Sequence, residues 1–430
     1  MTSATVPSSV VSSPVVPRTR LAILATHPIQ YLTPWFRYLA IRLDLEVLYA
    51  HQQDPAGQSA AGFGVNFEWD VPLLDGYRYR WLKNVSRRPG LQAFSGCDTP
   101  ELFDRIRPEN YDALLVLGWN RKSFIQGIRA AWKNKVVVIA RGDSQLSTQR
   151  SLLKRAIKFL PYRWFLPRLD AHLYVGQRNR EYLEHYGVQD RQLFFAPHFV
   201  DNEFFASEAK KLEGRRWEIR RRWGIPDGAF IALFVGKLIP EKRPLDLVKA
   251  AQLLLSSNFE LQSSASIRKL HLLFVGSGEL GDQLRSECNV VFDAERSAVS
   301  SPVVSGQRTA SPPASFAGFR NQTELPAFYA AANVLVLPGD ETWGLVVNEA
   351  MACGIPAIVS DAAGCGPDMI DADVTGWTFP MGDINALADR LTNFHRLDPD
   401  ALRHKCATYS IARATEGVRA SVELIQAKNC

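Results

Sequence analysis

The sequence predicts an α/β protein with two doubly wound domains, each a parallel sheet covered by helices, that face each other across a cleft. Its 430 residues exceed one ordinary hydrophobic core and suggest two domains of roughly 200 residues each. Short apolar segments alternate with helical patterns along the chain, as in parallel sheets. Several apolar segments are followed directly by glycine and charged residues, and such loops bind ligands at the carboxyl edge of parallel sheets.

The composition indicates a globular protein with reduced thiols. Hydrophobic residues make up 46% of the chain, with 23 Phe and 10 Trp, which is ample for burial. The six cysteines form neither a Cys-x-x-Cys pair nor a metal-binding spacing, so we expect a cytoplasmic protein. No apolar run approaches the ~20 residues that cross a bilayer. Residues 1–17 are rich in Ser, Val and Pro and predict a disordered tail rather than a signal peptide.

The charge balance favours anionic partners. The net charge is +6 and the isoelectric point is near 9.0. This excess suits a nucleotide diphosphate, an anionic acceptor or a lipid surface. No nucleic-acid-binding motif accompanies it, so we expect no nucleic-acid partner.

In the first half of the chain, apolar runs predict five strands: Arg20–Thr26, Leu45–Ala50, Ala113–Leu117, Lys135–Ala140 and His172–Val175. The segment from Gln52 to Pro100 is aromatic and poorly periodic, so we expect long loops over a pocket. We place the domain boundary near residue 205, which assigns residues 18–205 to the first domain.

In the second half, a charged helix from Glu208 to Trp223 precedes four predicted strands: Phe230–Val235, Leu270–Val275, Val334–Leu337 and Ala357–Ser360. Residues 206–409 form the second predicted domain. Within it, residues 293–315 are rich in Ser and Pro and predict a disordered insertion. The last segment, 410–430, carries a helical pattern from Ser410 to Ala427.

Residues 340–356 are the most informative segment. They follow the strand that ends at Leu337 and finish at Gly354 and Pro356, a helix stop before the next strand. This places Glu341 in a loop at a strand's carboxyl end and Glu349 inside the following helix, which starts near Gly344. A helix N-terminus in this position offers N–H groups to a phosphate. The two carboxylates would flank that phosphate and accept hydrogen bonds from sugar hydroxyls.

The spacing of these glutamates, followed by Ala-Met-Ala-Cys-Gly-Ile-Pro, resembles the signature of glycosyltransferase family 4. The resemblance implies the GT-B fold, a nucleotide-sugar donor and retention of the anomeric configuration. It implies that Glu341 contacts the donor sugar and that Glu349 holds the ribose. It further implies that the diphosphate lies against Gly344 and Leu345, with Thr342 and Trp343 beside it. In this fold the last helix crosses back onto the first domain, which would bind the acceptor.

A second segment, Phe234 to Arg243, places Gly236 at the end of a strand and Lys237 and Lys242 beyond it. Glycine allows close approach of a ligand, and two ammonium groups would stabilise a leaving diphosphate. Taken alone, two lysines in a polar loop would be solvated side chains; beside the Glu341 segment we interpret them as functional. The family usually has arginine where this chain has Lys237. We expect no metal and no cofactor, because these cations supply the charge.

Two further segments resemble the loops around the nucleobase. Gly276 follows the strand Leu270–Val275 in a glycine turn, a weak signal by itself. Phe319 and Arg320 lie in the segment whose backbone edges the base in the family. For Arg320 a solvated loop cation is an equal alternative to a phosphate or base contact.

In the first domain, two loops at strand ends carry polar residues that could meet the sugar. Thr26 to Tyr31 includes His27 and Gln30, a run found in some polysaccharide-type members of the family, although a satisfied loop histidine is the alternative. Arg141 and Asp143 lie where many members have a histidine that faces the sugar. Residues Ala196 to Asp201 match the linker to the second domain, and we interpret them as structural.

The segment from Leu152 to Arg168 mixes basic and aromatic residues. Such a helix can lie on an anionic membrane surface, which would make the protein peripheral on the inner face of the membrane. The alternative is an ordinary domain helix that buries its apolar stripe against the sheet.

Together these patterns predict a retaining glycosyltransferase that moves a sugar from a nucleoside-diphosphate sugar to a glycan or lipid-linked acceptor. Two alternatives stay open. One is a phosphorylase or an epimerase with the same fold, and the other is a non-catalytic subunit that binds nucleotide sugars.

Overall fold

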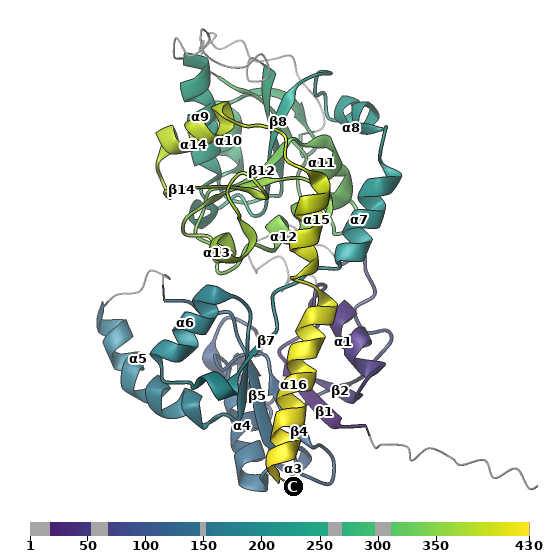
Figure 1. Ribbon diagram of the computed structural model, residues 1–430, viewed down its shortest axis with the longest axis vertical. Coiled ribbons are helices and arrows are strands. Elements are labelled where there is room, and N and C mark those ends of the chain that lie inside the picture. Colours follow the sequence, from purple (N-terminus) through teal and green to yellow (C-terminus); the bar gives the residue numbers. More distant parts are fainter. Residues whose placement is uncertain (1–17, 53–67, 147–151, 257–268, 297–310, 430) are drawn as a thin grey trace, which may run out of the picture.

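The computed structural model describes residues 18–52, 68–146, 152–256, 269–296 and 311–429. These residues form two lobes, each with a seven-stranded sheet and helices packed on it (Figure 1). Every described strand pair is parallel. The predicted fold class, two doubly wound α/β domains, is confirmed. The expected tail, residues 1–17, lies outside the described residues.

The first sheet has the strand order β3-β2-β1-β4-β5-β6-β7. Its strands are β1 (Arg20–Ala25), β2 (Asp44–Tyr49), β3 (Arg78–Trp81), β4 (Ala113–Val116), β5 (Val137–Arg141), β6 (Ala171–Tyr174) and β7 (Leu193–Phe195). Its helices are α1 (Thr33–Ala40), α3 (Leu102–Arg105), α4 (Lys122–Asn134), α5 (Leu152–Phe165) and α6 (Gln177–His185). The order reverses between β1 and β4, so their carboxyl ends open a crevice.

Five of these strands follow the predicted ranges to within two residues, whereas β3 and β7 were not predicted. β3 lies inside the segment from Gln52 to Pro100, where we expected only loops. Its four residues, Arg-Tyr-Arg-Trp, lie at the sheet edge and are largely exposed, so they lack the apolar run that marks a buried strand. β7 is only three residues long. Part of the expected loop, residues 53–67, lies outside the described residues.

The second sheet has the strand order β10-β11-β9-β8-β12-β13-β14. Its strands are β8 (Phe230–Val235), β9 (Leu270–Val275), β10 (Asn289–Asp293), β11 (Pro313–Phe316), β12 (Val334–Leu337), β13 (Ala357–Ser360) and β14 (Gly376–Phe379). Its helices are α7 (Asn202–Lys211), α8 (Arg216–Arg222), α9 (Pro244–Ser256), α10 (Gly281–Glu287), α11 (Leu325–Ala331), α12 (Leu345–Ala352), α13 (Gly366–Met369), α14 (Ile384–Thr392) and α15 (Pro399–Ala407). All residues of β8, β9, β12 and β13 are buried, which explains why continuous apolar runs located them.

The single helix expected from Glu208 to Trp223 is instead two helices, α7 and α8. Gly214 separates them with a left-handed backbone, φ +76°, which glycine adopts without a Cβ clash. Because α7 begins at Asn202 and packs on α11 and α12, the chain has already entered the second domain before residue 205.

The expected insertion, residues 293–315, is too wide at both ends. Asp293 closes strand β10, and Pro313–Phe316 form β11, which pairs with β10 on one side and β9 on the other. Buried residues of β11, such as Ala314, belong to the core. The low-complexity pattern hid a short strand, because Pro and Ser are poor strand signals. Residues 297–310 lie outside the described residues.

The chain ends by returning to the first domain. α15 packs on α12 of the second domain, and α16 (Ile411–Asn429) then contacts α1, β6 and β7. Figure 1 shows α16 running down along the first lobe. Its Ala414, Val418 and Val422 join the hydrophobic core of that domain. The two lobes are therefore joined twice, by the segment before α7 and by the step from α15 to α16.

Candidate functional site

A cavity of about 380 Å³ lies between the domains, at the carboxyl ends of β8 and β12. These strands are neighbours, with β9 beyond one and β13 beyond the other, so they flank the switch point of the second sheet. Fourteen of the sixteen predicted site residues line this cavity, all except His27 and Arg141. The sequence therefore predicted where the cavity lies. The two predicted residues that do not line it both belong to the first domain.

The loops that follow β8 and β9 lie so close together that one position requires glycine. A Cβ on Gly276 would lie 1.9 Å from the carbonyl oxygen of Gly236. The Gly236 N–H donates to Val275 O at 2.9 Å, and the Gly276 N–H donates to Gly318 O at 2.8 Å. These two hydrogen bonds join the loops that follow β8, β9 and β11 into one continuous wall of the cavity.

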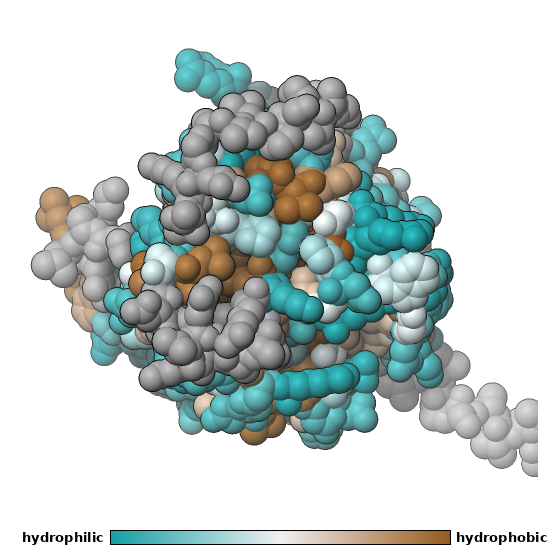
Figure 2. All heavy atoms as spheres, turned by 90° about the horizontal axis from the view of Figure 1, so that it is seen from above, coloured by the Kyte–Doolittle hydropathy of each residue, from teal (hydrophilic) through white to brown (hydrophobic). Residues whose placement is uncertain are grey.

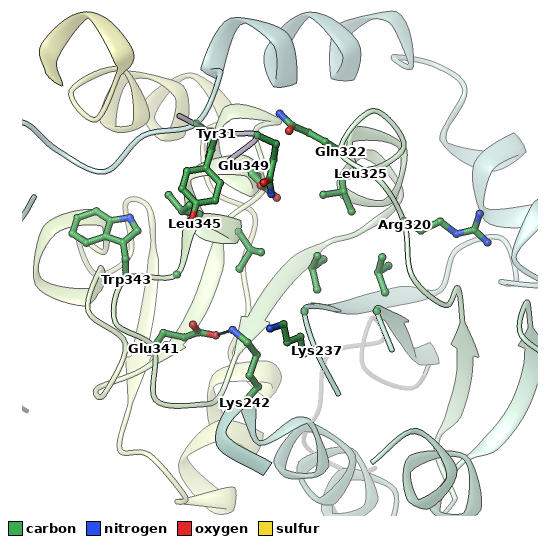
Figure 3. A pocket seen from close by; sticks show the side chains of 18 of the residues that line it. Tyr31, Lys237, Lys242, Arg320, Gln322, Leu325, Glu341, Trp343, Leu345 and Glu349 are labelled. Atoms are coloured by element: carbon green, nitrogen blue, oxygen red, sulfur yellow. Dashed lines mark hydrogen bonds and ion pairs between the residues drawn. The ribbon is translucent and has the colours of Figure 1, made fainter. Parts of the chain in front are cut away.

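Three charged groups converge at the floor of the cavity (Figure 3). Lys242 Nζ forms an ion pair with the Glu341 carboxylate, and both side chains are largely buried. Burial and the neighbouring Lys242 ammonium lower the pKa of Lys237, while Glu341 partly offsets the shift. Gly344 and Leu345, at the start of α12, line the same cavity. Two cations and a helix N-terminus at one point can stabilise a bound anion.

Glu349 lies one turn into α12, on the side of the cavity opposite Lys242 (Figure 3). Its Oε2 accepts a hydrogen bond from the Tyr329 hydroxyl at 2.5 Å. Burial raises the pKa of Glu349 to about 7, and the Tyr329 bond works against that shift. Tyr329 was not predicted, because in sequence it is indistinguishable from the other apolar positions of α11.

Trp343 lines the cavity and also contacts both segments that connect the two domains. Its Nε1 donates to Asn348 Oδ1 at 2.9 Å, which fixes the indole against α12. The ring packs 5.3 Å from His198 and 5.8 Å from Tyr409, measured between centroids. His198 lies in the segment 196–201, which we expected to be structural only, yet it lines the cavity as well.

Arg320 lies at the rim, but its guanidinium is engaged elsewhere. It donates to Ala317 O at 2.8 Å and pairs with Glu324 at 3.0 Å. Its guanidinium carbon lies 5.0 Å from the Trp223 ring centre. Figure 3 shows the side chain directed away from the cavity. Arg320 therefore offers backbone rather than charge to a ligand, whereas Phe319 lines the same rim.

Arg141 lines a smaller adjoining cavity of about 140 Å³. The two cavities share Tyr31, Asp143 and His198. Arg141 is 6% exposed and donates to Pro197 O at 3.0 Å, while its Nε has no partner among the described residues. Burial lowers its pKa to about 10, and the charge of Asp143 partly offsets this. The Nε2 atom of His198 likewise has no hydrogen-bond partner among the described residues.

His27 lines neither cavity. Its Nδ1 lies 2.9 Å from the hydroxyl of the adjacent Thr26. Burial, together with His51, lowers its pKa to about 4. The ring is therefore neutral near pH 7, and its hydrogen bond to Thr26 agrees with the alternative interpretation of a satisfied loop histidine. Gln30 of the same loop does line the main cavity.

Sequence reasoning also missed Trp69 and Gln322, which line the main cavity from opposite domains. Trp69 lies in the poorly periodic segment between Gln52 and Pro100, where no pattern distinguishes it from its neighbours. No group of three or more His, Cys, Asp or Glu side chains in the described part of the chain is arranged to hold a metal ion.

Residues 229–396, within the second domain, match the sequence model of the family described as glycosyl transferases group 1. The chain is 32% identical over 186 residues to a D-inositol 3-phosphate glycosyltransferase of Nocardiopsis dassonvillei, a match that covers 43% of this chain and 38% of that protein. It is 34% identical over 206 residues to a GDP-mannose-dependent alpha-mannosyltransferase of Mycobacterium tuberculosis, covering 48% and 40% respectively. The chain thus spans about two fifths of the length of these relatives.

Among solved structures, Anabaena HepE in complex with UDP superposes with a TM-score of 0.63 at 14% identity. The superposition covers 94% of this chain and 99% of that one. At this identity the likeness concerns the fold alone, which is the predicted GT-B arrangement. The matched model and relatives are glycosyltransferases, which is consistent with the resemblance to glycosyltransferase family 4.

Proposed function

We propose that this chain is a retaining glycosyltransferase that uses a nucleoside-diphosphate sugar. One observation carries the proposal: Lys237, the Lys242–Glu341 pair and the start of α12 line one cavity, with Glu349 across it from the pair. A nucleotide sugar has the matching order of ribose, diphosphate and sugar. The name of the M. tuberculosis relative includes GDP-mannose, and the HepE structure contains UDP, both of which support a donor of this class.

In the proposed reaction, the bond between the anomeric carbon and the diphosphate breaks while Lys237, Lys242 and the α12 N–H groups stabilise the departing charge. Glu341 orients the donor sugar as positive charge develops on its ring. The acceptor hydroxyl attacks from the face that the diphosphate leaves, and its proton passes to a departing phosphate oxygen. This sequence of steps retains the anomeric configuration.

The acceptor would approach from the first domain, through the smaller cavity. Arg141 Nε and His198 Nε2 are buried there without hydrogen-bond partners among the described residues, and Asp143 stands at the junction with the main cavity. A guanidinium donor, an imidazole nitrogen and a carboxylate together suit a hydroxyl-rich ligand, so we propose a glycan or lipid-linked acceptor.

A direct test measures binding of UDP-, GDP- and ADP-sugars by calorimetry and then follows sugar transfer to a panel of glycan and lipid-linked acceptors. We expect one nucleotide class to bind and its sugar to be transferred with retention, read from the anomeric proton by NMR. Turnover that requires inorganic phosphate would favour a phosphorylase. Tight donor binding without any turnover would favour a non-catalytic subunit.

The surface of α5 supports a peripheral membrane contact. Phe159, Tyr162 and Phe165 pack against the first-domain core. A second apolar stripe faces solvent, with Leu153 70%, Ile157 65%, Leu160 73% and Trp164 56% exposed. The packed face agrees with the interpretation as a domain helix, and the exposed face supports the proposed membrane contact. Apolar side chains reach the surface at the left margin of Figure 2, on the side where α5 lies in Figure 1.

The sequence of α5 contains four basic and no acidic residues, so anionic lipid is the surface that complements it. None of the helices within the described residues is long and apolar enough to cross a bilayer. In a flotation assay we expect the protein to move upward with vesicles of phosphatidylglycerol and phosphatidylcholine. The double variant Leu160→Glu, Trp164→Ser should stay in the bottom fraction with unbound protein. Trp217→Ser, at a 51% exposed Trp of the second domain, is the matched control. Equal flotation of the double variant and the control would refute the contact.

A further inference from the structure

We propose that Trp69, supplied by the first domain, is a nucleotide-binding residue that forms one wall of the nucleobase subsite. The inference rests on the proposed function and deepens it, because it assigns the base to a position between the two domains. Trp69 lines the main cavity although 150 residues and more separate it from the loops of the second domain that carry the site.

The residues on each side of Trp69 are bound to the second domain, Glu68 through its backbone carbonyl and Asp70 through its side chain. The Asn321 side-chain amide donates to Glu68 O at 2.7 Å. The Thr323 N–H donates to the Asp70 carboxylate at 3.1 Å, and the Thr323 hydroxyl donates to the same oxygen. Residues 68–70 thus bridge the cleft and hold Trp69 against the rim formed by residues 319–323.

The chemistry of this end of the cavity suits a nucleobase. Phe319, Gln322 and Leu325 line it, and the nearby Arg320 guanidinium is directed away. Figure 3 shows Gln322 and Leu325 on the same side as Glu349, with Lys242 and Glu341 across the cavity. The cations therefore mark the diphosphate end, and the aromatic and amide groups mark the opposite end.

An aromatic face and an amide are the groups that a base uses, since bases stack on aromatic rings and form hydrogen bonds along their edges. Two anchors already hold the segment around Trp69, so little freedom of this segment is lost when a base stacks on it. A nucleotide bound in this way touches both domains at once.

The experiment compares Trp69→Ala, Trp69→Phe and the wild type in calorimetric titrations with UDP, GDP and ADP, and with inorganic pyrophosphate. Base stacking on an aromatic residue is worth about 5- to 150-fold in affinity by alanine substitution. We expect Trp69→Ala to weaken binding of the preferred nucleoside diphosphate by about tenfold or more and to leave pyrophosphate binding unchanged. Trp69→Phe should recover most of the affinity.

A second readout separates stacking from a purely structural role. Nucleotide binding should quench tryptophan fluorescence in the wild type, and this quench should be largely lost in Trp69→Phe although the nucleotide still binds. Trp217→Ala, which changes a Trp outside the cavity lining, should keep both the affinity and the quench. Thermal unfolding of each variant verifies that it is folded.

Three results would overturn the inference. Unchanged nucleotide affinity in Trp69→Ala would remove Trp69 from the site. Equal loss of nucleotide and pyrophosphate affinity would mean that Trp69 only holds the cleft together. A wild type that binds none of the three nucleotides would contradict the proposed function itself, which distinguishes its failure from that of the Trp69 assignment.

Discussion

Lys242 and Glu341 form an ion pair at the floor of the interdomain cavity. Lys242 ends the turn Pro240–Lys242 after β8, and Glu341 lies in the loop after β12, so the pair links the two loops at the switch point. A bound diphosphate would compete with Glu341 for the ammonium group of Lys242. The free carboxylate could then accept a hydrogen bond from the donor sugar, which couples diphosphate binding to sugar orientation.

Lys242→Ala should lower kcat by on the order of 100-fold or more, because one electrostatic contact to a leaving group is typically worth that much. Thermal unfolding verifies that the variant is folded, because the change leaves the largely buried Glu341 carboxylate without its ion-pair partner. Lys249→Ala, at an exposed lysine of α9, is the matched control and should leave kcat unchanged. Steady-state kinetics on both variants test whether Lys242 stabilises the leaving diphosphate. Near-normal turnover in Lys242→Ala would mean that the diphosphate binds elsewhere.

Glu341→Gln and Glu349→Gln should separate in their effects. Glu349 is assigned to the ribose, a contact equal in ground and transition states, so its loss should mainly raise the Kd of the nucleoside diphosphate. Glu341 is assigned to the donor sugar as charge develops, so its loss should lower kcat while free nucleotide binds nearly as before. Calorimetry and kinetics on both variants test the pair of roles, and the reverse pattern would exchange the assignments.

Nucleotide affinity should depend on pH through Glu349, whose pKa lies at about 7 in the free protein. A ribose hydroxyl donates to the ionised carboxylate, so affinity should rise by up to about tenfold between pH 6 and pH 8 as the group loses its proton. The phosphate of the nucleotide also titrates in this range, so Glu349→Gln supplies the reference. The rise in the wild type should exceed the rise in the variant.

The same carboxyl group should make folding stability depend on pH. Its pKa in the folded state, about 7, exceeds the ordinary value of 4.5, so between these values the folded protein holds a proton that the unfolded chain has lost. The free energy of unfolding should therefore fall as pH rises from 4.5 to 7, by at most about 3 kcal/mol. Thermal unfolding should show Glu349→Gln more stable than the wild type at pH 8 and equal to it near pH 4.

Strands β8, β9, β12 and β13 of the second domain could be predicted closely from sequence, because all their residues are buried. Phe230–Val235 and Leu270–Val275 are continuous apolar runs, so their ends fixed the positions of Gly236 and Gly276. Once the strand ends were placed, parallel topology brought Lys242 and Glu341 to one edge. The edge strand β3 escaped prediction, because half-exposed strands lack such a run.

Side-chain direction and long-range contacts could not be predicted. The bonds that join Asp70 to Thr323 connect residues 253 positions apart, and no local pattern records them. Arg320 and His27 occupy the predicted loops, yet Arg320 pairs with Glu324 and His27 turns to Thr26. The partner that each of these side chains binds depends on residues that come close to it only in the folded chain.

Asp368 should control how firmly the two domains are joined. Its carboxylate accepts bonds from the Gln177 N–H at 3.0 and 3.1 Å, at the start of α6 in the first domain. It also accepts a bond from the Tyr409 hydroxyl at 3.1 Å, just before the chain returns to that domain. Asp368 is 8% exposed, so Asp368→Ala would leave the buried Tyr409 hydroxyl unpaired at a cost of about 1–3 kcal/mol and would also remove the acceptor of the partly buried Gln177 N–H.

We therefore expect Asp368→Ala to lower the midpoint of thermal unfolding by several degrees and to broaden or split the calorimetric transition as the domains uncouple. Turnover should fall more than nucleotide affinity, because transfer requires the acceptor side of the cleft. The lysines and Glu349 lie in the second domain, and the bonds of Glu68 and Asp70 still hold Trp69 there. Asp371→Ala is the control, since its 52% exposed carboxylate pairs only with Lys405 of α15 among the described residues. That exposed pair is worth at most about 1 kcal/mol. A single sharp transition with equal effects of both variants would show that Asp368 does not join the domains.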